Sequence, residues 1–119
     1  LPQNPRPEQR SGFLTSLLTG KIIYEMDGLS SLLDSVGEER WSSAVKRARS
    51  QISVSNYHGI EEAKQWFGTV GTLNDLIIHP LNGHSVSEKN VDSVNSELRS
   101  VISRIYDLLR EVERNASFE

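Results

Sequence analysis

Asp75, His79 and His84 lie close together in the sequence and have side chains of the kinds that bind metal ions. Imidazole and carboxylate groups are common ligands of zinc. In a helical zinc site, however, two histidines lie four residues apart, and the sequence has neither that spacing nor a His-Glu-x-x-His motif. We therefore expect His79 and His84 to be ordinary loop residues that donate hydrogen bonds to backbone carbonyls. We predict no metal site and no bound cofactor.

Other kinds of catalysis lack their sequence signatures as well. The chain has many serines but no Gly-x-Ser-x-Gly turn to present a nucleophile. Residues 68–72 contain two glycines, but the lysine of a phosphate-binding loop does not follow them. The carboxylate pairs Glu38–Glu39 and Glu61–Glu62 lie at expected helix starts, where the helix dipole favours acidic residues. We predict a protein that is not an enzyme and has no catalytic residues.

The stretch from Trp66 to His84 stands out for its low charge. Asp75 is its single charged residue, whereas 24% of the whole chain is charged. Loops are usually short and polar, so we expect an apolar loop of this length to be ordered and packed on the body of the protein. Leu73, Leu76 and Ile77 should then plug one end of the fold. An ordered loop of this kind is also a good platform for recognition.

Four segments must position this loop, and each shows helical periodicity. Apolar residues recur at steps of three and four, which is typical of amphipathic helices. We expect a bend near Asp27–Gly28, because glycine weakens a helix. Ser87 is a suitable N-cap for the last helix, and Val86 and Val91 have the spacing of a hydrophobic staple. The predicted helices cover residues 11–36, 38–54, 59–67 and 86–114.

These segments predict an all-α fold, a small antiparallel bundle of four helices with a long ordered loop before the last helix. A chain of 119 residues is long enough for one domain with its own core. Residues 1–10 hold three of the four prolines and should form an extended arm. The single helical domain then covers residues 11–114, and residues 115–119 should fray.

Composition argues against several partners. The net charge is −3, whereas nucleic-acid binding needs clustered basic residues. A basic run does exist, but only Trp41 is interleaved with it, so we interpret the run as a solvated helix face; it comprises Arg40, Lys46, Arg47 and Arg49. No stretch is apolar enough to cross a membrane. The absence of cysteine is compatible with a reducing compartment, and we expect a protein that binds neither nucleic acid nor membrane.

One segment carries a resemblance. Gly68-Thr-Val-Gly71-Thr-Leu-Asn74-Asp75-Leu-Ile-Ile resembles Gly-Gly-Met-Gly-Ser-Phe/Leu-Asn-Asp-Leu-Val-Leu, which marks a family of small bacterial proteins of unknown function. The likeness covers about residues 29–112 and departs from the family at Thr69 and Val70. The resemblance implies a cytoplasmic, mainly helical bacterial protein and supplies no reaction. In size, acidity and lack of catalytic motifs, the chain is similar to immunity proteins that neutralise a bacterial toxin.

We therefore expect a non-enzymatic protein whose partner is another protein, most concretely an immunity-type inhibitor that covers a toxin. Charge on an acidic surface would speed encounter with a basic partner. A self-associating structural or regulatory helical module, and thus a homodimer, stays open as the alternative, because residues 11–36 are apolar on more than one side. The expected partner-binding residues are Thr69, Thr72, Asn74, Asp75, His79, Asn82, His84, Glu88 and Asp92.

Overall fold

The structure is a computed structural model that describes the backbone of residues 7–68 and 72–117 and the side chains of residues 16–68 and 72–115. These parts of the chain contain four α-helices and three short 3-10 helices, with no strand. The all-α class is therefore confirmed. The α-helices are α1 (Pro7–Ser35), α2 (Glu39–Ser53), α3 (His58–Lys64) and α4 (Val91–Ser117), and the 3-10 helices are η1 (Leu73–Asp75), η2 (Pro80–Asn82) and η3 (Glu88–Asn90).

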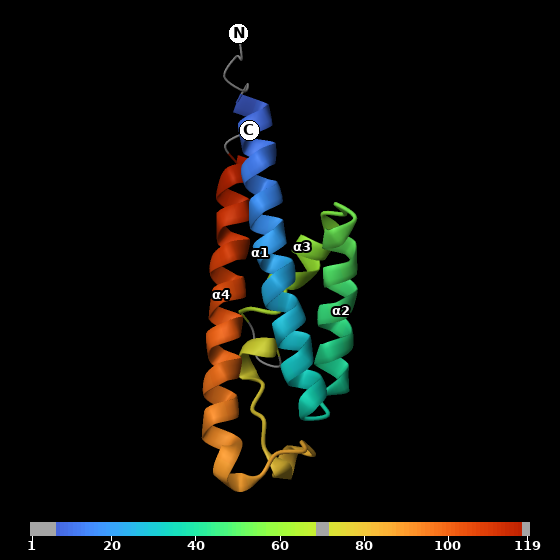
Figure 1. Cartoon of the computed structure of the whole chain (residues 1–119), viewed down its shortest axis with the longest axis vertical. Helices are drawn as coiled ribbons and strands as arrows, with labels where there is room; N and C mark the ends of the chain where they lie inside the picture. Colours follow the sequence, from blue (N-terminus) through green and yellow to red (C-terminus); the bar gives the residue numbers. More distant parts are fainter. Residues whose placement is uncertain (1–6, 69–71, 118–119) are drawn as a thin grey trace.

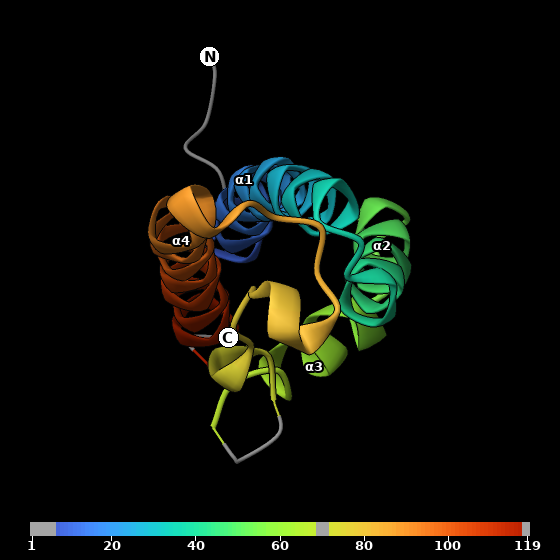
Figure 2. The same ribbon diagram turned by 90° about the horizontal axis from the view of Figure 1, so that it is seen from below.

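The long helices form an incomplete ring. α1 lies between α2 and α4, and its chain direction is opposite to that of both (Figure 1). Seen along the long axis, α4, α1 and α2 form an arc, while α3 and the segment that contains η1 and η2 fill the opposite side (Figure 2). We call residues 72–87 the packed loop, because they occupy the place that a further long helix would take in a regular bundle.

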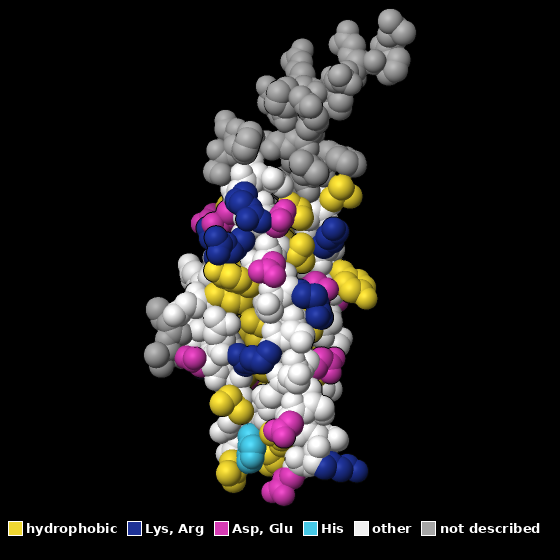
Figure 3. All heavy atoms as spheres, turned by 90° about the vertical axis from the view of Figure 1, so that its left-hand side faces the viewer, with side chains coloured by type: hydrophobic (Ala, Val, Ile, Leu, Met, Phe, Trp, Pro, Cys, Tyr) yellow, Lys and Arg dark blue, Asp and Glu magenta, His cyan; other side chains and the backbone are white. Residues whose placement is uncertain are grey.

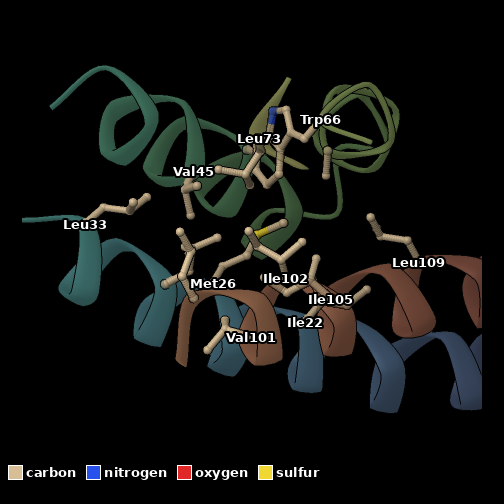
Figure 4. Packing of buried hydrophobic residues seen from close by; sticks show 14 of the residues in the cluster. Ile22, Met26, Leu33, Val45, Trp66, Leu73, Val101, Ile102, Ile105 and Leu109 are labelled. Atoms are coloured by element: carbon tan, nitrogen blue, oxygen red, sulfur yellow. The ribbon is translucent and has the colours of Figure 1, made fainter. Parts of the chain in front are cut away.

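The core combines side chains from the helices and the packed loop. On α1, Ile22, Met26, Leu29 and Leu33 are fully buried, at the spacing that places residues on one helix face. Val45 of α2, Trp66 after α3 and Ile102 of α4 close around this face (Figure 4). The packed loop adds two fully buried residues, Leu73 and Ile78. The loop is thus part of the core and not only a cover over it.

Two helix ends and an expected bend differ from the prediction. α1 begins at Pro7, so residues 7–10 of the predicted arm are helical, as suits proline in a first helical turn. α1 continues unbroken through Asp27–Gly28, because Met26 and Leu29 are buried on either side of these residues and Arg49 holds Asp27 through two hydrogen bonds of 2.9 and 3.3 Å. α4 continues to Ser117, beyond the predicted fraying point. Residues 1–6 and 118–119 lie outside the described residues.

The start of α4 also differs from the prediction. The chain first forms η3, and α4 proper begins at Val91. Ser87 precedes η3, but its side chain makes no capping hydrogen bond. The predicted contribution of Ser87 as an N-cap is therefore wrong.

The corner between α1 and α2 is held by polar contacts. Gly37 has a φ of 76°, which suits glycine after a helix end, and the amide of Glu38 donates to the carbonyl of Leu33 at 2.9 Å. Asp34 accepts hydrogen bonds from Lys46 Nζ at 2.8 Å and from the hydroxyl of the buried Ser42. The pKa of Asp34 is lowered below its ordinary value of 3.8. The main cause is the hydrogen bond from Lys46, and the next is the hydrogen bond from Ser42.

This lowered pKa predicts a pH-dependent effect of Asp34→Asn. The ionised carboxylate stabilises the folded state above the ordinary pKa of 3.8, and this contribution is lost as the pH falls through the lower pKa of the folded protein. At neutral pH we expect the variant to unfold at a lower urea concentration than the wild type, and at strongly acidic pH we expect this difference to vanish.

Urea unfolding followed by circular dichroism over this pH range measures the effect. Glu97→Gln is the matched control, because Glu97 is exposed and makes no ion pair with any residue that the structure describes. A difference between Asp34→Asn and wild type that does not change with pH contradicts the assignment.

Candidate functional site

The packed loop divides its apolar side chains between the core and the solvent. Ile78 is fully buried, Leu76 is half-buried, and Ile77 is 58% exposed. The backbone of Leu76 is extended, and in an extended chain consecutive side chains point to opposite sides. The expectation that Ile77 plugs the fold is therefore wrong, and Ile78 takes that role.

Two side chains of α4 bind the backbone of the packed loop. The side-chain amide of Asn95 accepts a hydrogen bond from the amide of Ile78 at 2.8 Å and donates one to the carbonyl of the same residue at 2.8 Å. One helical turn further on, the guanidinium of Arg99 donates to the carbonyls of Asn74 and Leu76. α4 thus satisfies backbone groups that a neighbouring strand would satisfy in a sheet.

The other end of the packed loop is bound to the corner between α1 and α2. The amide of Ser85 donates to the carbonyl of Val36 at 2.9 Å. His84 is buried, and its Nδ1 accepts a hydrogen bond from the amide of His79 at 3.1 Å. Because Nδ1 is an acceptor, the ring proton lies on Nε2, which donates to Glu38 Oε1 at 3.0 Å. The second oxygen of Glu38 accepts from the amide of Trp41 and so caps α2.

A tight turn lies between these two attachments. Its last residue is Gly83, whose φ of 85° suits glycine, and the amide of Gly83 donates to the carbonyl of Pro80. Nδ1 of His79 accepts from the amide of Leu81 at 3.0 Å, and the side chain of Asn82 donates to the carbonyl of Ile77 at 3.0 Å. The turn therefore keeps its shape through its own side chains.

Both loop histidines use Nδ1 as a hydrogen-bond acceptor for a backbone amide. The expectation that they donate to carbonyls is wrong, although the backbone is indeed their partner. In the described parts of the chain, no three His, Asp or Glu side chains come together in a way that could hold a metal ion. Asp75, His79 and His84 form no such group, and the contact between the two histidines is the hydrogen bond from the amide of His79 to Nδ1 of His84.

The expected partner-binding residues fall into three groups. His84 is buried and bonded to Glu38, so it is absent from the surface, and Thr69 lies outside the described residues. Thr72 and His79 are half-buried. The exposed group comprises Asn74, Asp75, Asn82, Glu88 and Asp92.

Two exposed hydrophobic residues were missed by the sequence reasoning. Leu81 is 90% exposed, and Ile77 is 58% exposed. The signal for Leu81 was present, because a leucine that follows Pro80 and precedes Asn82-Gly83 lies at the tip of a turn. For Ile77, the strict alternation of an extended chain would have separated it from Ile78.

The basic run on α2 is paired within the molecule. Lys46 binds Asp34 at 2.8 Å, Arg47 binds Glu62 at 2.6 Å and Arg49 binds Asp27 at 2.9 Å. The hydrogen bond from Glu62 raises the pKa of Arg47. Three of the four basic residues of the run are thus in ion pairs, whereas the guanidinium of Arg40 lies over the ring of Trp41, 5.9 Å from its centroid. Among the residues described, no helix is both long enough and apolar enough to cross a membrane.

Comparison with known proteins adds one family. A model of a family described as a domain of unknown function (DUF6966) matches residues 34–87. The match covers less than half of the chain and leaves out most of α1 and all of α4. No curated protein and no solved structure gives a significant match. The chain is thus similar to a family of unknown function over α2, α3 and the packed loop.

Asn95→Ala tests the attachment of the packed loop to α4. The variant leaves the buried backbone of Ile78 without its partners, and we expect a loss of about 2–3 kcal/mol in the free energy of unfolding. Urea unfolding measures this loss, and Ser96→Ala, at an exposed neighbouring position on the same helix, should change stability little. Equal stability of the two variants would show that Asn95 does not hold the loop.

His84→Ala tests the attachment to the α1–α2 corner. The variant removes the acceptor for the amide of His79 and the donor to Glu38, so we expect a loss of about 2–4 kcal/mol in the free energy of unfolding. His58→Ala is the matched control, because the side chain of His58 is 78% exposed. His84→Asn should lie between the two, since its side-chain oxygen can accept from the amide while the contact with Glu38 is lost. Thermal unfolding of the three variants gives this order or rejects it.

Proposed function

We propose that this chain is a non-enzymatic protein-binding protein, most concretely a cytoplasmic bacterial immunity protein that inhibits a toxin by covering its surface. The observation that carries the proposal is the combination of a firmly bonded loop with a hydrophobic tip. Ile77 and Leu81 are exposed, although the loop backbone on which they stand is bound by Asn95, Arg99 and His84.

This bonding favours affinity. Association costs conformational entropy when a loop has to become ordered in the complex. Asn95 and Arg99 of α4 already hold the backbone on both sides of Ile77, at Ile78 and Leu76, and the turn fixes the backbone at Leu81. A large hydrophobic side chain on a preorganised backbone is the usual form of an energetic anchor in an interface. Ile77 and Leu81 are therefore our anchor residues.

Charge supports a basic partner. Residues 72–92 contain three acidic residues and one basic residue, Lys89. The acidic residues Asp75, Glu88 and Asp92 are all exposed. Acidic groups on a binding surface steer a basic partner toward it and contribute more to the association rate than to the lifetime of the complex. An enzyme that acts on nucleic acid would present such a basic surface, and a toxin of that kind is the partner that fits best.

Two further observations agree with an inhibitor. The loop histidines are engaged with the backbone, and the packed loop offers no group of residues arranged for catalysis. The resemblance of residues 68–78 to a motif from small bacterial proteins supports a bacterial origin, and the similarity to immunity proteins in size and acidity supports the inhibitor role. A protein of this kind acts by occupying a surface and needs no reaction of its own.

Leu81→Asp and Ile77→Asp test the proposal against the product of the adjacent gene, as the candidate toxin. We expect the wild type to bind this product and to protect cells that express it. Each variant should raise the dissociation constant by about tenfold or more, because a hydrophobic anchor residue is replaced by a charge that the complex would bury. Titration calorimetry measures binding, and cell survival measures protection.

Val54→Asp is the matched control. Val54 is 75% exposed and follows α2, at the opposite end of α2 from the α1–α2 corner where the packed loop is attached. The same substitution there should leave binding unchanged. Failure of the wild type to bind or protect, or an equal effect of Val54→Asp, would reject the packed loop as the binding surface.

A further inference from the structure

A groove between α1 and α4 lies outside the packed loop. It has a volume of about 580 Å³, and its lining is mostly apolar. Leu17 is 49% exposed and Tyr24 is 77% exposed, so two large side chains of α1 face solvent here. The face over α4 shows hydrophobic side chains among basic and acidic ones (Figure 3). The lining residues are Leu17, Gly20, Lys21, Tyr24, Glu25, Arg104, Asp107 and Leu108.

The lining residues of α1 form one helix face. Leu17, Gly20 and Tyr24 recur at steps of three and four, as residues do that share a side of a helix. A Cβ atom added to Gly20 would meet no other atom within 4 Å. No contact with the residues that the structure describes therefore requires glycine at this position, and the middle of the groove is open.

An ion pair sets the register of the two helices beside the groove. Arg104 Nε of α4 binds Glu25 Oε2 of α1 at 3.0 Å, and the Glu25 side chain is only 17% exposed. α1 and α4 run in opposite directions (Figure 1). The residue one turn before Glu25 on α1 and the residues one turn after Arg104 on α4 therefore lie at the same height along the helix axes. Lys21 is thus level with Asp107 and Leu108, across the groove.

Lys21 and Asp107 are charged residues of the groove that have no ion-pair partner among the described residues. Both are exposed. One wall of the groove therefore carries an unpaired cation and the other an unpaired anion at the same height. Such an arrangement is complementary to itself when the molecule is turned by 180° about an axis that runs along the groove.

We propose that the groove binds a second copy of this chain, with the twofold axis parallel to α1 and α4. In this dimer, α1 of each copy packs on α4 of the other, and the four helices form a bundle. Lys21 meets the partner's Asp107, and the symmetry makes the same contact a second time. Leu17 and Tyr24 leave the solvent, and the open space at Gly20 lets the helices approach closely.

The charges favour a second copy over an unrelated partner. A strongly charged partner would find no complement in a groove whose walls carry one Lys, one Arg, one Glu and one Asp. A twofold contact satisfies Lys21 and Asp107 together and leaves the Glu25–Arg104 pair intact. The proposal is independent of the toxin-inhibitor proposal, because the groove and the packed loop share no residue.

Sedimentation equilibrium of wild type and charge-reversal variants tests the dimer. We expect the wild type to dimerise below about 1 mM, and Lys21→Glu or Asp107→Lys to weaken the dimer by about tenfold or more, because each brings two like-charge pairs together. The double variant Lys21→Glu/Asp107→Lys should restore dimerisation, because it exchanges the signs and keeps both pairs. Lys89→Glu changes the same charge outside the groove and should have no effect.

Each outcome decides the question. A wild type that stays monomeric up to about 1 mM rejects the dimer. A wild-type dimer that the single reversals do not weaken, or that the double variant does not restore, uses another face and also rejects it. Circular dichroism of every variant checks that the monomer is folded and helical, as we expect because neither charge has an ion-pair partner in the described parts of the chain.

Discussion

A loop that packs where a further helix would lie leaves its backbone N–H and C=O groups without helical or strand partners. Buried groups of this kind must find hydrogen bonds elsewhere, because an unpaired one costs about 1–3 kcal/mol. Here Asn95 and Arg99 supply them from α4, and His84, Ser85 and the turn supply them at the other end. The apolar side chains of the loop can enter the core only because these bonds exist. The same bonds also hold the backbone that carries the exposed side chains of Ile77 and Leu81.

The family match gains a structural meaning from this arrangement. The match begins at residue 34 and ends at residue 87. Close to these two limits, the amide of Ser85 donates a hydrogen bond to the carbonyl of Val36. The matched segment thus closes on itself at the α1–α2 corner. It contains Glu38 and His84 but neither Asn95 nor Arg99, so the corner bonds lie inside the segment and the α4 bonds lie outside it. The two long helices outside it, α1 and α4, add the groove and about half of the buried hydrophobic residues of the core.

The sequence allowed the helices to be predicted because their apolar residues repeat at a helical period, and the buried face of α1 follows that period. It did not allow the contact between Glu38 and His84 to be predicted, since these residues are far apart in the chain and only the fold brings them together. Glu38 looked like an acidic residue at a helix start, which it is, and nothing local indicated a histidine partner. Ile77 was assigned to the wrong side, and no side was predicted for Ile78, because the loop was treated as a plug and its extended backbone was not considered.

The two proposed surfaces constrain each other through the direction of the twofold axis. An axis parallel to α1 and α4 keeps both copies in the same direction, so the two packed loops lie at the same end of the dimer. An axis perpendicular to the helices would place the two packed loops at opposite ends of the dimer. It would also pack α1 on α1, so that Lys21 would face Lys21 or Glu25 of the other copy instead of its Asp107. With both loops at one end, a dimeric partner could engage both tips at once, and the second contact would form at a high effective concentration. A monomeric partner would gain nothing from this geometry, so the oligomeric state of the partner decides whether dimerisation strengthens binding.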